Sequence, residues 1–285
     1  MKTIRRLYFY AVAAISIEVV LWGIIGLLRS IFDAQDITNN ASNLASALAL
    51  ILVGVPIFLI HWVWAQNVSA KDAEEGSAGV RAIFLYGILL GTLIPAVQNL
   101  LALINRTFLT TANLYAYRAV VGGSQSWLDN LIAILINLLI AAYFWNVLKA
   151  NWRTLSEPEA FSEIRRLYRF VWVLYGLLMT VYGAQQALTY AFAMPSSTLG
   201  DIGREMAVNA TALLVIGTPI WFFSWRILQD ALADSAEKES YLRLGILYLL
   251  TLGGVIVFLI AGGNLIYMIL LQLLGGGESW REFIR

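Results

Sequence analysis

Seven long apolar stretches dominate the sequence and limit what the chain can fold into. Each has the length of about 20 residues that a helix needs to cross the hydrocarbon core of a bilayer. We expect membrane-spanning helices at residues 7–30, 42–65, 82–106, 128–150, 167–192, 206–229 and 244–274. Backbone groups cannot stay unpaired in hydrocarbon. The pattern therefore predicts an all-α polytopic integral membrane protein with seven transmembrane helices, in a single membrane domain over residues 1–285.

The composition agrees with the bilayer as solvent. Hydrophobic residues make up 60% of the chain and charged residues only 13%, whereas a soluble domain carries about 25% charged residues. So apolar a chain has too little polar surface to cover a water-soluble globule. The lipid bilayer is the expected environment, and we expect the protein in the inner or plasma membrane of the cell.

The positions of Lys and Arg predict the orientation. If the N-terminus is inside, most of the 19 Lys and Arg residues fall beside the inner ends of the spans. An excess of Lys and Arg marks the cytoplasmic side of a membrane protein. Seven spans put the two ends of the domain on opposite sides, so the sequence predicts an N-in/C-out topology.

Several classes of function are disfavoured by what the sequence lacks. The formal net charge is only +1, and no basic face suggests nucleic acid as a partner. The chain has no cysteine and a single histidine, which disfavours thiol chemistry and metal sites built from two such ligands. We find no catalytic constellation, so we expect no cofactor, no metal and no enzyme activity. A membrane-embedded lipid enzyme is a weaker alternative.

Short motifs recur along the chain. Arg6-Leu7-Tyr8 opens the first span and Arg166-Leu167-Tyr168 the fifth, while Gly54-Val55-Pro56 recurs 163 residues later as Gly217-Thr218-Pro219. Self-similarity at a fixed spacing is typical of repeat architectures. The spacing predicts tandem two-helix hairpin repeats, with units at approximately 5–79, 80–163 and 164–239 and a half repeat at 240–285. Gly23, its counterpart Gly183 and the pair Gly262-Gly263 favour close contacts between helices.

An arginine opens several spans after an acidic loop. Arg81 follows Glu74 and Glu75, and Arg243 follows Glu237 and Glu239. A cation at a helix start opposes the helix macrodipole. These arginines therefore need another reason, which is lipid phosphate, the acidic loop, orientation of the chain or a docking surface for a partner.

These motifs together resemble a family of uncharacterised bacterial multi-pass membrane domains. The resemblance rests on the Arg-Leu-Tyr helix starts, on Gly54-x-Pro56 followed by His61-Trp62, and on the acidic loops before each arginine. It implies membrane location and repeated helix pairs, and it implies no known catalytic residue. Ser224 stands where the second copy of the motif would have its histidine, so a role for His61 is not shared by the copies.

Glu18 is an ionisable residue inside the first predicted span. At 1.5 Å per residue it lies near the middle of the first helix. Ionisable groups inside a membrane are costly and often functional. One interpretation is a protonated Glu18 hydrogen-bonded to a neighbouring helix, and the other is proton or cation handling. Asn137 of the fourth span lies at similar depth and is a candidate hydrogen-bond partner.

Two further groups of polar residues are candidates for an intramembrane or interfacial site. Five amides lie in the outer halves of spans that run from inside to outside: Gln98, Asn99, Gln185, Gln186 and Asn264. They would either line an outward-facing vestibule or form hydrogen bonds between helices. His61 lies near the inner interface and is a candidate titrating residue.

The sequence favours an interaction or accessory subunit, or a small sensor. Its partner would be another membrane protein or a second copy in a homo-oligomer. The alternative is a small-solute or proton-coupled transporter or channel in which Glu18 titrates and the outer amides form the entry.

Overall fold

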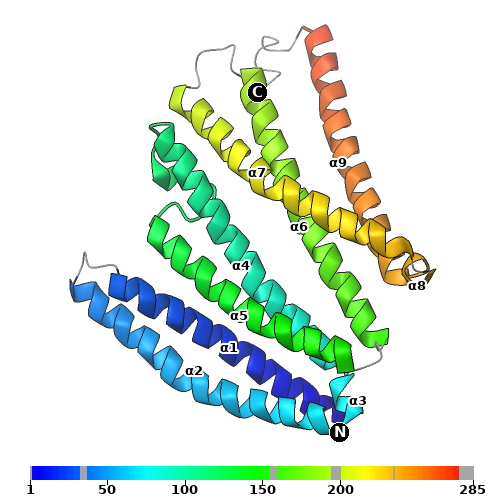
Figure 1. The fold of residues 1–285 in the computed structure, drawn as a ribbon. Helices are drawn as coiled ribbons and strands as arrows, with labels where there is room; N and C mark the ends of the chain where they lie inside the picture. The colour runs from blue at the N-terminus through cyan, green and yellow to red at the C-terminus, as the bar shows by residue number, and fades with distance from the viewer. Residues whose placement is uncertain (1, 33–36, 155–158, 194–199, 234, 276–285) are drawn as a thin grey trace. The chain divides into compact units, whose positions relative to one another are not determined.

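The computed structural model describes residues 2–32, 37–154, 159–193, 200–233 and 235–275, and the regular elements among them are all helical (Figure 1). The long helices are α1 (Lys2–Phe32), α2 (Ile37–Lys71), α4 (Gly79–Thr111), α5 (Trp127–Thr154), α6 (Glu159–Ala193), α7 (Gly200–Asp230) and α9 (Tyr241–Leu273). The short ones are α3 (Ala73–Gly76), η1 (Ala116–Arg118), η3 (Ala231–Ala233) and α8 (Ser235–Lys238).

The seven long helices are each apolar enough to cross a membrane, as a search of the described residues finds. Each predicted span falls on one of them, so the all-helical class and the number of spans are confirmed for this part of the chain. The helices extend beyond the predicted spans: α6, for example, begins at Glu159 rather than at residue 167. The extra turns carry polar residues, which the hydrocarbon criterion excludes.

The chain divides into two compact units. The first comprises Met1–Thr107 with Ala119–Tyr168, and the second comprises Phe108–Arg118 with Arg169–Arg285. The first unit therefore holds α1, α2, α5 and most of α4. The second holds α7, α9 and most of α6.

An aromatic cluster forms the core of the first unit. Phe144 of α5 is fully buried, and its ring lies 5.2 Å from Trp62 of α2 and 5.7 Å from Phe84 of α4 between centroids. The indole Nε1 of Trp62 also donates to the phenol oxygen of Tyr143 at 2.7 Å. Buried indole and phenol groups need such partners because an unpaired polar atom is costly in an apolar core.

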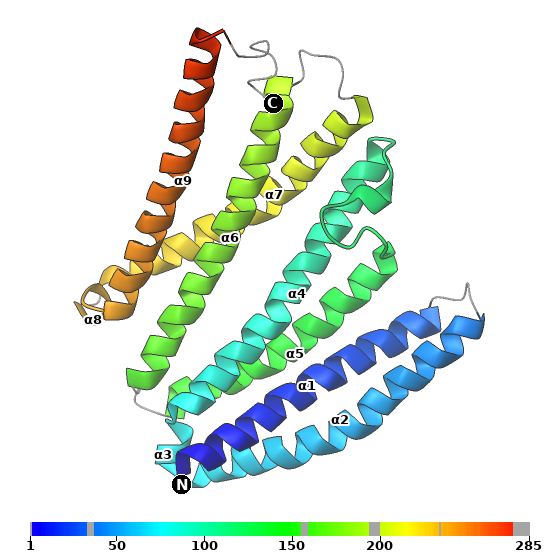
Figure 2. The ribbon, with the colours of Figure 1, turned by 180° about the vertical axis from the view of Figure 1, so that it is seen from behind.

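Glycines bring α1 and α2 together, and the two helices lie side by side in both views (Figures 1 and 2). A Cβ placed on Gly23 would lie 3.1 Å from the carbonyl oxygen of Ala47 and 3.1 Å from Cβ of Leu50. A Cβ on Gly54 would meet the side chain of Val20 at 2.8 Å. The close contact predicted for Gly23 is confirmed. Small residues at such contacts let helix backbones approach inside a membrane.

In the second unit, glycines likewise allow α6 and α7 to pack closely. A Cβ on Gly183 would lie 3.2 Å from the carbonyl oxygen of Ala210 and 3.0 Å from Cβ of Leu213. On Gly217 it would lie 2.7 Å from Cβ of Met179. The contact predicted for Gly183 is therefore confirmed as well.

A turn after α4 directs the chain into η1. Asn113 has a positive φ of 57°, the backbone N–H of Leu114 donates to Leu109 at 2.8 Å, and that of Asn113 donates to Thr110 at 3.1 Å. This is the Schellman arrangement, in which a left-handed residue ends a helix and satisfies its last carbonyl groups. It fixes where η1, which carries Arg118, begins.

Helix α9 differs from the other spans in its burial. None of the residues in its most apolar 18-residue window is buried, whereas half of those in the corresponding window of α4 are. A Cβ on Gly262 or Gly263 would meet nothing within 4 Å. The close contact predicted for this pair is therefore not made within the described part of the chain.

Candidate functional site

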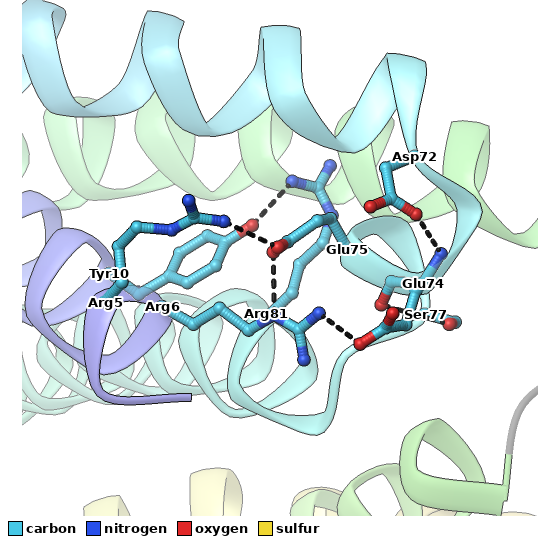
Figure 3. A network of polar contacts seen from close by, with 8 residues as sticks. All are labelled: Arg5, Arg6, Tyr10, Asp72, Glu74, Glu75, Ser77 and Arg81. Atoms are coloured by element: carbon cyan, nitrogen blue, oxygen red, sulfur yellow. Dashed lines mark hydrogen bonds and ion pairs between the residues drawn. The ribbon is translucent and has the colours of Figure 1, made fainter. Parts of the chain in front are cut away.

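Ion pairs tie the start of α1 to the segment between α2 and α4 (Figure 3). Arg5 lies 3.0 Å from a carboxylate oxygen of Glu75, and Arg6 lies 2.7 Å from Glu74 and 2.7 Å from the second oxygen of Glu75. Asp72 caps α3 by accepting the backbone N–H of Glu74 at 2.9 Å. The three acidic residues of this loop are thus engaged by α1 or by α3.

Arg81, the first arginine of α4, lies deeper and is only 2% exposed. Its Nη1 donates to the phenol oxygen of Tyr10 at 3.0 Å (Figure 3). Its Nη2 donates to Oε1 of Gln66 at 2.6 Å and to Oδ1 of Asn151 at 3.3 Å. The guanidinium also lies 5.9 Å from the ring of Trp62. Its hydrogen-bond partners are all neutral.

A cavity of about 930 Å³ adjoins this arginine. Arg81, Gln66 and Asn151 form part of its wall, together with Lys71 and Ser69. A buried guanidinium is costly unless it is paired and hydrogen-bonded. The cavity therefore combines two cations with several hydrogen-bonding groups, and such a lining can hold an anion.

Glu18 lies beside an apolar groove between α1 and α4. One of its carboxylate oxygens would be 2.7 Å from a Cβ placed on Gly91, so the carboxylate fills the space that this glycine leaves. Trp22, one turn further along α1, lines the same groove. Pro95 has no N–H to donate to the carbonyl of Gly91. Glu18 thus faces the point where the hydrogen-bond ladder of α4 is interrupted.

Asn137 is not hydrogen-bonded to Glu18 in the structure. Its amide nitrogen donates to the carbonyl of Ala133 on its own helix at 2.8 Å, and its side-chain oxygen is buried with no partner. Its link to Glu18 therefore stays a prediction from the sequence.

His61 lies against the aromatic side chains at the start of α1. Its ring centroid is 5.9 Å from that of Tyr8 and 5.3 Å from that of Phe9. Its Nδ1 lies 2.7 Å from the carbonyl of Ile57. A carbonyl only accepts, so Nδ1 carries the proton in this contact.

The five outer amides divide between the two units. Gln98 is exposed on α4, and Asn99 is half-buried and donates to the carbonyl of Pro95 at 2.8 Å. The second unit holds Gln185, Gln186 and Asn264, of which only Gln186 is buried. The shared vestibule stays a prediction, because it requires residues of both units.

A bifurcated ion pair in the second unit could not be predicted from the sequence. Nη1 of Arg118 lies 2.7 Å from both carboxylate oxygens of Glu205 on α7. The hydrogen bond with Glu205, followed by that with Tyr117, raises the pKa of the Arg118 guanidinium. The two partners are 87 residues apart in the sequence, and no local motif predicts that they pair.

A comparison with models of known protein families agrees with the resemblance found in the sequence. The model of a domain of unknown function, DUF5671, matches residues 6–139 and 166–284. The chain belongs to this family. No curated protein and no solved structure matches the chain. The resemblance to an uncharacterised domain family is thus confirmed, and seven apolar helices fit a membrane protein of unknown function.

Arg81 and its hydrogen-bond partners lie partly inside and partly outside the residues that the DUF5671 model matches. Tyr10, Gln66 and Arg81 fall in the first matched segment, whereas Asn151 lies between the two segments. Most of the site therefore belongs to the DUF5671 domain, and one wall of the cavity comes from the part of the chain that joins its two segments.

Proposed function

We propose that this protein is an accessory subunit of the inner or plasma membrane that binds a transmembrane helix of a partner protein through α9. The observation that carries the proposal is the lack of burial along an apolar helix: the most apolar window of α9 has a mean hydropathy of 2.6 and no buried residue.

A comparison of α9 with α4 supports a protein partner. Arg81 and Arg243 are 162 residues apart, and so are Tyr86 and Tyr248 that follow them in α4 and α9. Arg81 and Tyr86 fall in the first segment that the family model matches, and Arg243 and Tyr248 fall in the second. Although the starts of the two helices correspond, half of the α4 window is buried and none of the α9 window is.

The partner's chemistry follows from what covers α4. Within the first unit α4 packs against apolar and aromatic side chains of α5, among them Phe144 and Leu148, which are fully buried. We infer that an apolar helix of this kind covers α9. A second copy of the chain could not lend its own α5, because that helix is already packed in its first unit.

Glycine contacts support the proposed tandem repeat. Gly23 and Gly183 are 160 residues apart, and the residues that they meet, Ala47 and Ala210, are 163 residues apart. Leu50 and Leu213 correspond in the same way. The hairpins α1–α2 and α6–α7 therefore use equivalent contacts, as two copies of one unit would. The excess of Lys and Arg supports the N-in/C-out orientation.

The transport alternative has less support. The groove beside Glu18 has a volume of about 790 Å³. Apart from Glu18, Tyr10 and Trp22, its described lining residues are apolar. A pathway for protons or small polar solutes needs polar groups or water along its length. The geometry therefore favours an interaction role over transport.

Photo-crosslinking in intact cell membranes tests the proposal. A photoreactive residue would be introduced at Phe258 of α9 and at its neighbours through one turn, with Leu52 of α2 as the control because it is also exposed. We expect one face of α9 to give a discrete protein adduct that Leu52 does not give.

Two results would contradict this form of the proposal. If α9 gave only the adducts of Leu52, the helix would face lipid alone. An adduct of twice the 31.6 kDa chain mass from the same face would replace the accessory role with self-association.

A further inference from the structure

Arg81 carries a positive charge into the interior of the first unit without an opposite charge beside it. It is 2% exposed, and its hydrogen-bond partners Tyr10, Gln66 and Asn151 are neutral. In the described part of the chain no carboxylate lies within ion-pair distance of it. Such a cation is destabilising unless an anion joins it.

The acidic residues of the neighbouring loop already pair with other groups. Both carboxylate oxygens of Glu75 are held by Arg5 and Arg6, Glu74 pairs with Arg6, and Asp72 caps α3. The acidic loop that precedes Arg81 in the sequence therefore does not neutralise it.

Arg81 keeps two N–H groups, one on Nε and one on Nη1, without a partner in the described part of the chain. Its three hydrogen bonds use three of the five N–H groups of a guanidinium, and its Nε is buried without a partner. The Nη2 edge, held by Gln66 and Asn151, lies at the wall of the cavity of about 930 Å³. That volume falls in the range of small-molecule sites.

We propose that this cavity binds a phosphate group, with Arg81 as its buried anchor and Lys71 as a second cation. Phosphate offers several strong acceptor oxygens, and arginine and lysine are the side chains that most often bind it. Asn146 lines the same cavity and adds an amide donor. The binding site is separate from α9 and does not depend on the accessory role.

Phosphate could reach this site from the headgroup of an anionic phospholipid or from solution. The cavity is lined by the last turns of α2 and α5, by α3 and by Arg81 at the start of α4, which the sequence places at the inner membrane interface. Both sources are available there, so the experiment separates them.

The test uses the full chain in lipid nanodiscs. In nanodiscs of phosphatidylcholine alone, sodium phosphate is titrated and its heat of binding is measured. In nanodiscs that also contain phosphatidylglycerol, native mass spectrometry counts the phosphatidylglycerol molecules that stay bound. We expect binding in at least one arm: heat with phosphate indicates a soluble ligand, and retained phosphatidylglycerol indicates a lipid headgroup.

Variants tie the binding to the cavity. R81Q should weaken it at least about ten-fold, because charge-assisted hydrogen bonds are the strong ones. K71Q, at an exposed position that should not affect folding, should weaken it about three-fold or more. R243Q, which alters the corresponding arginine of α9, should bind like the wild type.

Three results would overturn the proposal. The wild type could bind in neither arm, or R81Q could bind as tightly as the wild type. If R81Q failed to fold, unchanged binding by K71Q would decide against the site on its own.

Discussion

The phenol of Tyr10 and the guanidinium of Arg81 are joined by a buried hydrogen bond of 3.0 Å, which links α1 to the start of α4. Tyr10 is 6% exposed. The cation is thus held by a neutral oxygen from another helix, and the loss of that oxygen would leave a third N–H of Arg81 without a partner.

Tyr10→Phe should therefore destabilise the protein by about 1–3 kcal/mol, the cost of leaving a buried donor unsatisfied. The measurement is the free energy of unfolding in mixed micelles. Tyr8→Phe is the matched control, since Tyr8 is 58% exposed. Equal stability of the two variants would show that the Tyr10–Arg81 bond contributes nothing.

Gly217→Ala should also destabilise the protein, by about 1–3 kcal/mol, because the new methyl group would press on Met179 of α6. Gly253→Ala on α9 is the control: nothing lies within 4 Å of its new Cβ, and alanine is the better helix former by about 1 kcal/mol. The thermal unfolding midpoint should fall for the first variant and hold or rise for the second. The reverse order would disprove the close packing of α6 and α7.

Glu18→Gln should change the free energy of unfolding by less than about 1 kcal/mol, because the amide has nearly the same volume and fills the same space beside Gly91. In proteoliposomes loaded with a pH-sensitive dye, wild type and variant should show the same proton flux. A flux that the substitution abolished would restore the transport interpretation.

Glu205→Gln should loosen η1 by weakening its ion pair with Arg118. Hydrogen exchange of the Arg118 amide, which bonds the carbonyl of Tyr115 at 3.1 Å, should speed up about ten-fold. Asp201→Asn, which disrupts an exposed pair with Arg204, should leave that rate unchanged. If both variants exchanged alike, the pair would have no role in ordering η1.

The pH dependence of this pair has a definite sign. The raised pKa of Arg118 means that the guanidinium contributes stability at every pH below its ordinary pKa and loses it only above the raised one. Exchange protection should therefore not fall between pH 7 and 10 through deprotonation of Arg118. In Arg118→Lys it should fall above about pH 10, near the ordinary pKa of lysine.

The spans could be predicted because hydrocarbon thickness imposes one length on every apolar helix. The ends were less predictable: α2 continues to Lys71, beyond residue 65 where its predicted span ends. Polar turns outside the hydrocarbon keep their helical hydrogen bonds, and an apolar count does not include them. The close contacts of Gly23 and Gly183 were predictable because small residues let helices in a membrane approach closely, whereas the same rule does not hold for Gly262 and Gly263 in the described part of the chain.

The Arg81 site was only partly predictable. The sequence marks the arginine at the start of α4 and the acidic loop before it, yet the loop pairs with Arg5 and Arg6. The partners of Arg81 come from α1, α2 and α5, up to 71 residues away. Which residues meet at that distance depends on how the helices pack, and no local pattern encodes it.

The accessibility of α9 in native membranes tests the central claim most directly. The chain contains no cysteine, so single cysteines can be placed at residues 255–258, one turn of α9, and at Leu52 as a control. Their labelling by a lipid-soluble diazirine, whose photogenerated carbene inserts into a thiol without ionisation, is compared between cell membranes and purified protein in nanodiscs. Our account predicts that one face of α9 is protected in cells and labelled after purification, while Leu52 is labelled alike in both. Equal labelling of every α9 position in the two preparations would contradict it.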